Sequence, residues 1–388
     1  MGSGTAAAVG GWSRRRFVGA LGAVAAAGGS VAGCADGPDT EHPAVSRSTA
    51  PSGTSPRALY LGTYTSAEGG GRGIGVASYD PASGRITGGG TITGVADPSY
   101  LALHPDGRTL YAVNERERGT VTAVRPADRT VLGSAATGGA HPCHLSVHPG
   151  GRWLLSADYG SGSVAVHRIE ASGALGARGD LVAHRGPAHA HQFVTAPDGG
   201  HLLAVDLGTD TVYSYLLDER SGTLREVARA RTRPGAGPRH LAFHPGGRYA
   251  YLANEVDDTL TVCAYDPSTG RLTIGAPQST GSGAGTNYPA QPVVSPDGRF
   301  AYLANRGANT LARYAVEADG ARLRLLGTVP VAGDFPRQIA LSPDGRLLFA
   351  ANQRSSTVSV FHVDPDSGGL RLAGEPFASP VAVCALPL

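Results

Sequence analysis

A unit with one fixed order of features occurs six times in the chain, and this repeat limits the fold more than any other feature of the sequence. Each unit has an apolar run, a Pro followed by Asp-Gly or Gly-Gly, an Arg or His, and a second apolar run that ends in Asn or Asp. Successive turn prolines are 44, 48, 48, 51 and 47 residues apart. Repeats of this length are typical of β-propellers, in which each repeat forms one four-stranded blade. The units are residues 99–114, 143–158, 191–206, 239–254, 290–305 and 337–352.

Each unit predicts a β-hairpin, because Asp-Gly and Gly-Gly favour the tight turns that join antiparallel strands. Two more strand-like runs follow each hairpin, for example residues 259–266 and 271–277 after the fourth unit. The 57 glycines fit a chain with many such turns. The expected fold class is therefore all-β, a propeller whose blades have four strands and whose repeat unit supplies the first two.

The two ends of the repeat region predict how the ring closes. Residues 58–64, 73–80 and 90–95 resemble the second, third and fourth strands of a blade, with no first strand before them. Residues 380–386 resemble a lone first strand. If this C-terminal strand completes the N-terminal blade, the ring has seven blades and no exposed sheet edge. The alternative is a six-bladed ring with ragged ends.

The first 34 residues are predicted to be a targeting segment. Residues 13–18 match the twin-arginine export pattern, and the apolar stretch 17–31 is too short to span a bilayer. The next residues, 31–34, resemble a lipobox that ends in Cys34, the expected site of lipidation. The alternative is an ordinary signal with a chance cysteine. We therefore expect a signal over 1–34, a flexible linker over 35–57, a propeller over 58–388, and a lipoprotein on the outer face of the cell membrane, attached only through Cys34.

Composition excludes several kinds of chemistry. All 33 basic residues are Arg, so a Lys base or Schiff base is absent. The formal net charge of +2 gives no electrostatic reason to expect nucleic-acid binding. No metal-ligand motif and no nucleophile-elbow triad occurs, and we expect neither a metal nor a cofactor. Cys143, Cys263 and Cys384 lie in apolar runs and are expected to be small buried side chains.

The hairpin geometry sorts the polar residues between two ends of the ring. His104, His148 and His244 precede the turn proline and are expected to be structural. The start of the first strand and the end of the second lie at the opposite end from the turn, so their residues should ring one mouth of the central channel. The candidates at this mouth are His144, His191, Arg239, His240, Gln291 and Arg337 from first strands, and Glu115, Asp206, Glu255, Arg306 and Gln353 from the ends of second strands.

The chain resembles the bacterial lactonase-type seven-bladed propellers, a family that includes 6-phosphogluconolactonases and a fungal carboxymuconate-lactonising enzyme. The resemblance covers about residues 58–388 and is carried by residues 235–255, 60–65, 295–307 and 379–386. It implies a site formed by His191, Arg239, Glu255 and Arg306. A position that is often acidic in relatives is Gln291 here, which removes one candidate carboxylate.

Lactone hydrolysis needs a water, a base that activates it, and donors where the oxyanion develops. Glu255 and His191 are the two candidate bases, and Arg239 and Arg306 are expected to hold an anionic substrate and polarise its carbonyl. The remaining candidates would contact substrate: His144, His240, Glu115, Asp206, Gln291, Arg337 and Gln353. We expect a monomer that acts on a small-molecule lactone, either a sugar lactone or a related one, with or without a phosphate. Two alternatives remain open: the polar residues form structural contacts only, or the propeller is a non-catalytic, envelope-tethered binding module.

Overall fold

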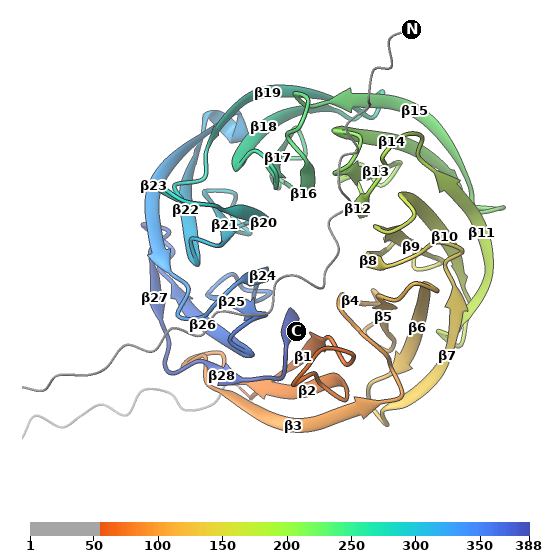
Figure 1. Ribbon diagram of the computed structural model, residues 1–388, viewed down its shortest axis with the longest axis horizontal. Coiled ribbons are helices and arrows are strands. Elements are labelled where there is room, and N and C mark those ends of the chain that lie inside the picture. The colour runs from red at the N-terminus through yellow and green to blue at the C-terminus, as the bar shows by residue number, and fades with distance from the viewer. Residues whose placement is uncertain (1–54) are drawn as a thin grey trace, which may run out of the picture. The chain divides into compact units, whose positions relative to one another are not determined.

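The apolar runs of the repeat form antiparallel strands, and seven sheets built from them surround a central axis (Figure 1). The structure, a computed structural model, describes residues 55–388. The innermost strand of each sheet is the first strand of a repeat. These inner strands are β4 (Leu101–Leu103), β8 (Pro142–Val147), β12 (Ala190–Thr195), β16 (Pro238–Phe243), β20 (Tyr288–Val294), β24 (Pro336–Leu341) and β29 (Ala382–Pro387).

Three further strands follow outward in each sheet. The second strands are β5 (Leu110–Asn114), β9 (Trp153–Asp158), β13 (His201–Asp206), β17 (Tyr249–Asn254), β21 (Phe300–Arg306), β25 (Leu347–Asn352) and β1 (Arg57–Thr63). The third strands are β6 (Thr120–Arg125), β10 (Ser163–Ile169), β14 (Thr211–Asp218), β18 (Thr259–Asp266), β22 (Thr310–Glu317), β26 (Thr357–Val363) and β2 (Gly73–Tyr79). The outer strands are β7 (Thr130–Ala136), β11 (Leu175–Ala183), β15 (Thr223–Arg231), β19 (Arg271–Ser279), β23 (Arg322–Pro330), the pair β27 (Leu370–Leu372) and β28 (Phe377–Ala378), and β3 (Ile86–Thr93). A short 3₁₀ turn, η2 (Ala318–Gly320), precedes β23.

The ring closes as the ends of the repeat region predict. Strand β29 pairs with β1 in antiparallel register, with Tyr60 opposite Leu386 and Leu61 opposite Ala385. The N-terminal and C-terminal parts of the propeller thus share one sheet, ordered β29-β1-β2-β3. The seven-bladed ring is confirmed and the six-bladed alternative is wrong.

Two details differ from the sequence-based expectation. Strand β1 begins at Arg57, one residue inside the predicted linker, and the outer strand of the last blade is split into β27 and β28. The predicted signal, lipobox and Cys34 lie outside the described residues. Within residues 55–388 we find no helix with the length and apolar character needed to cross a membrane.

The hydrophobic core consists of seven clusters, one between each pair of neighbouring blades. The cluster between the β9 and β13 blades, for example, packs Trp153 against Phe193 and Tyr215, each at most 2% exposed. The second strands pack on both faces, so all six residues of β13 are buried. This is why these strands read as continuous apolar runs rather than as alternating ones. Cys143, Cys263 and Cys384 are buried and form no disulfide within residues 55–388, which confirms their predicted role as small core side chains.

Two of the three histidines before the turn prolines, His104 and His148, form structural contacts between blades, as predicted. Nε2 of His104 lies 2.8 Å from the carbonyl of Gly151 in the next blade, and Nδ1 contacts Asp106 of its own turn, 2.8 Å from Oδ1 and 3.2 Å from the backbone nitrogen. Nε2 of His148 likewise lies 3.3 Å from the carbonyl of Gly199, and its Nδ1 accepts the N–H of Gly150. Because a carbonyl oxygen only accepts, Nε2 is the donor in both contacts between blades. These histidines therefore link neighbouring hairpin turns at the end of the ring opposite the candidate site.

Candidate functional site

Irregular pairing at the start of the inner strands positions the channel-facing residues. In the hairpin of β12 and β13, Ala190 is opposite Asp206 and Gln192 is opposite Val205, so His191 is left unpaired. The same register shift leaves Arg239 unpaired in β16 and Arg337 unpaired in β24. Such bulges break the strict alternation of side chains between the two faces of a sheet. Two consecutive residues, Arg239 and His240, can therefore both line the channel.

A carboxylate with two arginines forms the first part of the site. One oxygen of Glu255, Oε2, accepts a hydrogen bond from Nη2 of Arg306 at 2.5 Å and lies 2.9 Å from Nε of Arg239. The N–H of Arg239 does not point at this oxygen, so that contact is an ion pair without a hydrogen bond. The Arg239 and Arg306 side chains are only 2% and 5% exposed. The hairpin of β16 and β17 joins Glu255 to Arg239, and the next blade supplies Arg306.

The charges of this group hold one another in the ionised state. Burial by itself would raise the pKa of Glu255, but Arg306 and Arg239 lower it below its ordinary value. Burial, and then the charge of Arg306, lower the pKa of Arg239 to about 9, which still leaves it protonated at neutral pH. Backbone carbonyls also stabilise the two guanidinium groups. Arg239 donates a hydrogen bond to the carbonyl of Ala290 at 2.9 Å, and Arg306 donates one to the carbonyl of Tyr288 at 3.0 Å.

A second carboxylate holds a third arginine on the same channel. Glu115 Oε2 accepts a 2.6 Å hydrogen bond from the Tyr64 hydroxyl and lies 3.5 Å from Nη2 of Arg337. The guanidinium of Arg337 also lies over the ring of Tyr64. Burial alone would lower the pKa of Arg337, but Tyr64 and Glu115 raise it above its ordinary value. Three arginines thus face two glutamates, a formal excess of one positive charge within this group of five residues.

Three buried histidines lie beside the arginines. Nδ1 of His191 is 3.1 Å from Nε2 of His240, so one proton is shared between the two nitrogens. The ring of His144 packs edge-on against that of His240, with centroids 5.3 Å apart. Nδ1 of His144 accepts the backbone N–H of Phe193 at 3.4 Å, which assigns its proton to Nε2.

All three imidazoles are neutral at pH 7. Burial, and then the charge of Arg239, lower the pKa of His144 to about 3. The same two causes, in the same order, lower the pKa of His191 and of His240 well below the ordinary value. A neutral imidazole has one nitrogen that can accept a proton. Nε2 of His191 makes no hydrogen bond to any residue within 55–388, which leaves it available for a substrate or water.

Two of the histidines, His191 and His240, and two of the arginines, Arg239 and Arg337, line a small cavity in the channel. It leaves about 10 Å³ for the centre of a water molecule, which is about the room that one ordered water requires. Gln291 lines this cavity and accepts a long 3.5 Å hydrogen bond from the hydroxyl of Tyr100. The lining residues include Tyr100, His191, Arg239, His240, Gln291 and Arg337.

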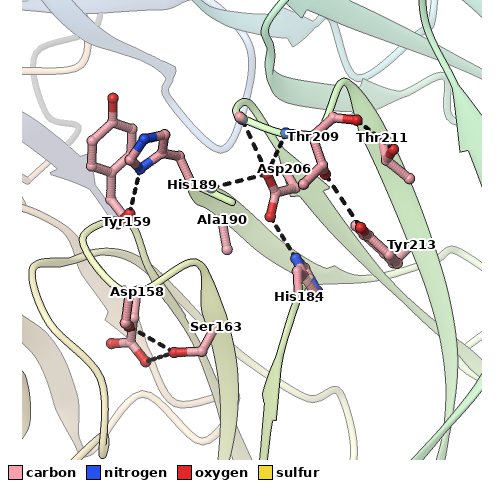
Figure 2. Close-up of polar contacts among 12 residues, drawn as sticks. Asp158, Tyr159, Ser163, His184, His189, Ala190, Asp206, Thr209, Thr211 and Tyr213 are labelled. Carbon is pink, nitrogen blue, oxygen red and sulfur yellow. Dashed lines mark hydrogen bonds and ion pairs between the residues drawn. The ribbon is translucent and has the colours of Figure 1, made fainter. Parts of the chain in front are cut away.

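Two of the residues expected to contact substrate do not join this cluster. Asp206 is fully buried, and its oxygens are occupied by His184 Nδ1 at 2.6 Å and by the backbone N–H groups of His189, Gly208 and Thr209 (Figure 2). The expectation that Asp206 contacts substrate is therefore corrected: it caps the loop before β12. Gln353 reaches the mouth end of β25, but no hydrogen bond or ion pair within residues 55–388 joins its side chain to the cluster.

Asp158 and Asp206 end equivalent second strands, yet we predict opposite effects when each is replaced by Asn. Asp158 is buried with one oxygen unpartnered, and burial raises its pKa to about 7. Asp206 is ionised, because His184 and the backbone N–H groups outweigh the effect of burial and lower its pKa. Four other units have Asn here: Asn114, Asn254, Asn305 and Asn352. At pH 8, Asp158→Asn should leave the free energy of unfolding unchanged or raise it by about 1 kcal/mol, whereas Asp206→Asn should lower it by about 2 kcal/mol. Urea unfolding of both variants measures this difference, and equal effects would contradict it.

Sequence reasoning missed two aromatic residues of the site. Tyr100 has the same place in the first unit as His144 and His240 have in theirs, and its ring lies 4.3 Å from that of His144. Tyr64 follows β1 as Glu115 follows β5. Aligning the six units with the N-terminal strand would have placed both at the mouth.

The described residues contain no grouping suited to a metal ion. No set of three or more His, Cys, Asp or Glu side chains between residues 55 and 388 has a metal-binding arrangement. The three histidines instead contact one another and Tyr100. What the site can do chemically is bind an anionic or carbonyl oxygen with arginines and accept a proton on a neutral imidazole.

Comparison with known proteins gives one consistent result. The model of a family described as lactonase, 7-bladed beta-propeller, matches residues 58–387. A 6-phosphogluconolactonase of Bacillus subtilis is 30% identical over 291 residues, covering 71% of this chain and 82% of that protein. A periplasmic gluconolactonase of Pseudomonas aeruginosa has a similar structure, with a TM-score of 0.79, 31% identity, and coverage of 86% of this chain and 99% of that one. A protein from Lactobacillus plantarum superposes with a TM-score of 0.80 at 32% identity over the same shares of the two chains.

Proposed function

Because the chain belongs to the family of seven-bladed β-propeller lactonases, we propose that it opens a sugar-derived lactone by attack of water at the mouth of its central channel. One observation carries this proposal. Arg239 pairs with Glu255 beside Arg306 and also lines the cavity that holds the neutral His191. A cationic pair for the developing oxyanion and a base for the water thus meet at one place.

The arginines would bind the substrate and stabilise the charge that develops on it. Arg239 and Arg306 are fixed by Glu255 and by backbone carbonyls, so they need no reorganisation during the reaction. The group of three arginines and two glutamates has a formal excess of one positive charge, which favours a substrate with an oxyanion, carboxylate or phosphate. Oε2 of Glu255 is held by both arginines, whereas Nδ1 is the ring nitrogen of His191 that is hydrogen-bonded, and its Nε2 can take a proton from water. We therefore assign Glu255 the role of positioning the arginines and His191 that of the base.

The reaction balances with the groups present. Water adds its oxygen to the lactone carbonyl carbon while Nε2 of His191 takes one of its protons. The carbonyl oxygen becomes an oxyanion that receives hydrogen bonds from the arginines. The ring C–O bond then breaks, and the leaving alkoxide oxygen takes the proton back from His191. The product is a hydroxy acid, and His191 returns to its neutral state.

The names of the relatives and the predicted export signal support a choice of substrate class. Of the two named relatives described above, one is called a 6-phosphogluconolactonase and the other a periplasmic gluconolactonase. The predicted twin-arginine signal and lipidated Cys34 would place this chain outside the cytoplasm. We therefore propose a sugar lactone without a phosphate as the substrate. A phosphorylated sugar lactone is the alternative within the same chemistry.

Turnover of a lactone panel tests the proposal. The purified protein is assayed by acid release against gluconolactone, 6-phosphogluconolactone and an acyl lactone, with the rate in buffer subtracted. We expect saturable hydrolysis of gluconolactone that exceeds the rate on the phosphorylated compound. A preference for 6-phosphogluconolactone would instead favour the alternative substrate class, phosphorylated sugar lactones. A folded protein without turnover on any member would favour the non-catalytic binding module.

A further inference from the structure

Side chains of one blade complete the free edge of the next inner strand around the channel. The amide of Gln192 accepts the N–H of Leu241 at 2.8 Å and donates to its carbonyl at 3.1 Å. Gln338 makes the same pair of hydrogen bonds with Ala385, at 2.8 and 3.2 Å. Each of these backbone groups belongs to an edge strand, whose outward N–H would otherwise have no partner.

His144 uses its ring in place of the glutamine amide. Its Nδ1 accepts the N–H of Phe193 in the next blade. Phe193 is equivalent to Leu241, because Phe193 pairs with Ala204 as Leu241 pairs with Leu252, the fourth residues of β13 and β17. The N–H at this position therefore determines the tautomer of a histidine that faces it: Nδ1 is the acceptor and Nε2 carries the proton.

His240 occupies the position of His144 but meets a different residue. The equivalent position in the next blade is Pro292, which pairs with Leu303, the fourth residue of β21. Proline has no N–H. Accordingly, Nδ1 of His240 is a buried nitrogen without a hydrogen-bond partner within residues 55–388. The substitution is tolerated in the strand because the nitrogen of this residue faces away from its ladder partner, as edge prolines do.

The missing N–H has a consequence for the neighbouring ring. Nε2 of His240 is hydrogen-bonded to Nδ1 of His191, and with both rings neutral only one of these nitrogens carries the proton. If His240 is protonated on Nε2, it donates to Nδ1 of His191. The proton of His191 must then lie on Nε2, and this nitrogen cannot act as a base. If His191 is protonated on Nδ1, it donates to His240, and Nε2 of His191 keeps a free lone pair.

We propose that Pro292 is a positioning residue that sets this tautomer pair, by withholding the N–H that would otherwise hold the proton of His240 on Nε2. Pro292 thereby allows His191 to be protonated on Nδ1, with Nε2 unprotonated. The consequence for catalysis rests on the proposed function, in which Nε2 of His191 accepts a proton from water. The low pKa values of both histidines support it, since burial and the charge of Arg239 keep both rings neutral.

The tautomers are measured directly by ¹⁵N NMR of the imidazole nitrogens at pH 7.5. In the wild-type protein we expect His144 to be protonated on Nε2 and a large fraction of His191 to be protonated on Nδ1. In Pro292→Ala, the new N–H should shift the ratio of the two His191 tautomers toward Nε2 protonation by about five-fold, the equilibrium equivalent of one hydrogen bond. His144 serves as the internal reference. Pro296→Ala, which replaces the exposed turn proline of the same hairpin, is the matched control and should leave all three signals unchanged.

Kinetics separate this inference from the proposed function. If lactone hydrolysis is found, kcat of Pro292→Ala should fall several-fold while KM stays within about two-fold. A tautomer shift in a protein without lactonase activity would support the role of Pro292 and reject the proposed function. A wild-type His191 protonated wholly on Nε2, or unchanged tautomers in a folded Pro292→Ala variant, would overturn the role of Pro292. The wild-type spectrum decides the matter even if the variant fails to fold.

Discussion

Replacing Glu255 by Gln is expected to lower kcat for lactone hydrolysis by about two to three orders of magnitude. The change keeps the shape of the side chain but removes the charge that holds Arg239 and Arg306, both nearly fully buried. Loss of one positioned oxyanion donor costs about 10²- to 10³-fold in other enzymes, and here two donors lose their common partner. The free energy of unfolding should also fall, by about 3 kcal/mol, because the two arginines become uncompensated buried charges. Steady-state kinetics and urea unfolding measure the two effects.

Glu317 provides a matched control for this experiment. It also contacts two arginines, at 2.6 Å from Arg322 and 2.7 Å from Arg324, but both arginine side chains are more than half exposed and the group lies at the end of β22. Exposed ion pairs contribute little. Glu317→Gln should therefore leave kcat and KM unchanged. Equal activity of the Glu255→Gln and wild-type proteins, with the variant folded, would show that the Glu255 group is a structural ion pair only.

Acidification should destabilise the propeller steeply between about pH 6.5 and pH 4. Burial lowers the pKa of His144 to about 3 and of His167 to about 4, and lowers the pKa of His191 and His240 well below the ordinary value. Below pH 6.5 the unfolded chain protonates these four histidines and the folded chain does not. Asp158 acts in the opposite direction, because burial raises its pKa to about 7 and the folded state holds its proton. The net uptake on unfolding is about three protons near pH 5.

That uptake corresponds to a loss of about 4 kcal/mol in the free energy of unfolding per pH unit near pH 5. Full stability is expected above pH 7, and it is lost as the pH falls toward the folded-state values. Urea unfolding curves at pH 7.5, 6 and 5 measure the slope. A free energy of unfolding that is constant from pH 7.5 to 5 would show that these histidines are protonated in the folded protein.

His167 allows the contribution of one buried histidine to the acid destabilisation to be measured away from the candidate site. It lies in β10, is fully buried, and neither ring nitrogen has a hydrogen-bond partner within residues 55–388. The equivalent residue of the last blade is Phe361, since His167 pairs with Leu154 as Phe361 pairs with Leu348. His167→Phe should raise the free energy of unfolding at pH 7.5 by about 1–2 kcal/mol and lower the acid slope by about one proton, with lactone turnover unchanged.

Much of this architecture could be predicted from the sequence because it is encoded locally. Each hairpin has its own apolar runs, its own turn residues and its own Asn or Asp at the end, and the six repeats together with the two ends of the repeat region give the number of blades. The closing strand could also be identified, because Ala382–Pro387 has the apolar pattern of an inner strand without a hairpin partner in sequence. The same hairpin geometry predicts that Arg239 and Glu255 lie close together. Arg239 is the first residue of a repeat unit, and Glu255 directly follows the last residue of that unit.

Side-chain contacts between blades could not be predicted from the repeat. Glu115 meets Tyr64, 51 residues away, and Arg337, 222 residues away. The residue at the end of a second strand could turn toward the channel or cap a loop, and the presence of His184 decided that Asp206 does the latter. The bulges that leave His191, Arg239 and Arg337 unpaired are likewise invisible in the pattern of apolar residues.

The sequence by itself therefore determined a closed seven-bladed ring and the set of residues near one mouth. The tertiary structure alone decided which of those residues touch, which are neutral, and which tautomers the histidines can adopt. The physical reason is the range of the interactions involved. Strand pairing within a blade depends on neighbours in the chain, whereas the ion pairs, the desolvation of His191 and His240, and the missing N–H at Pro292 depend on how one blade packs against the next.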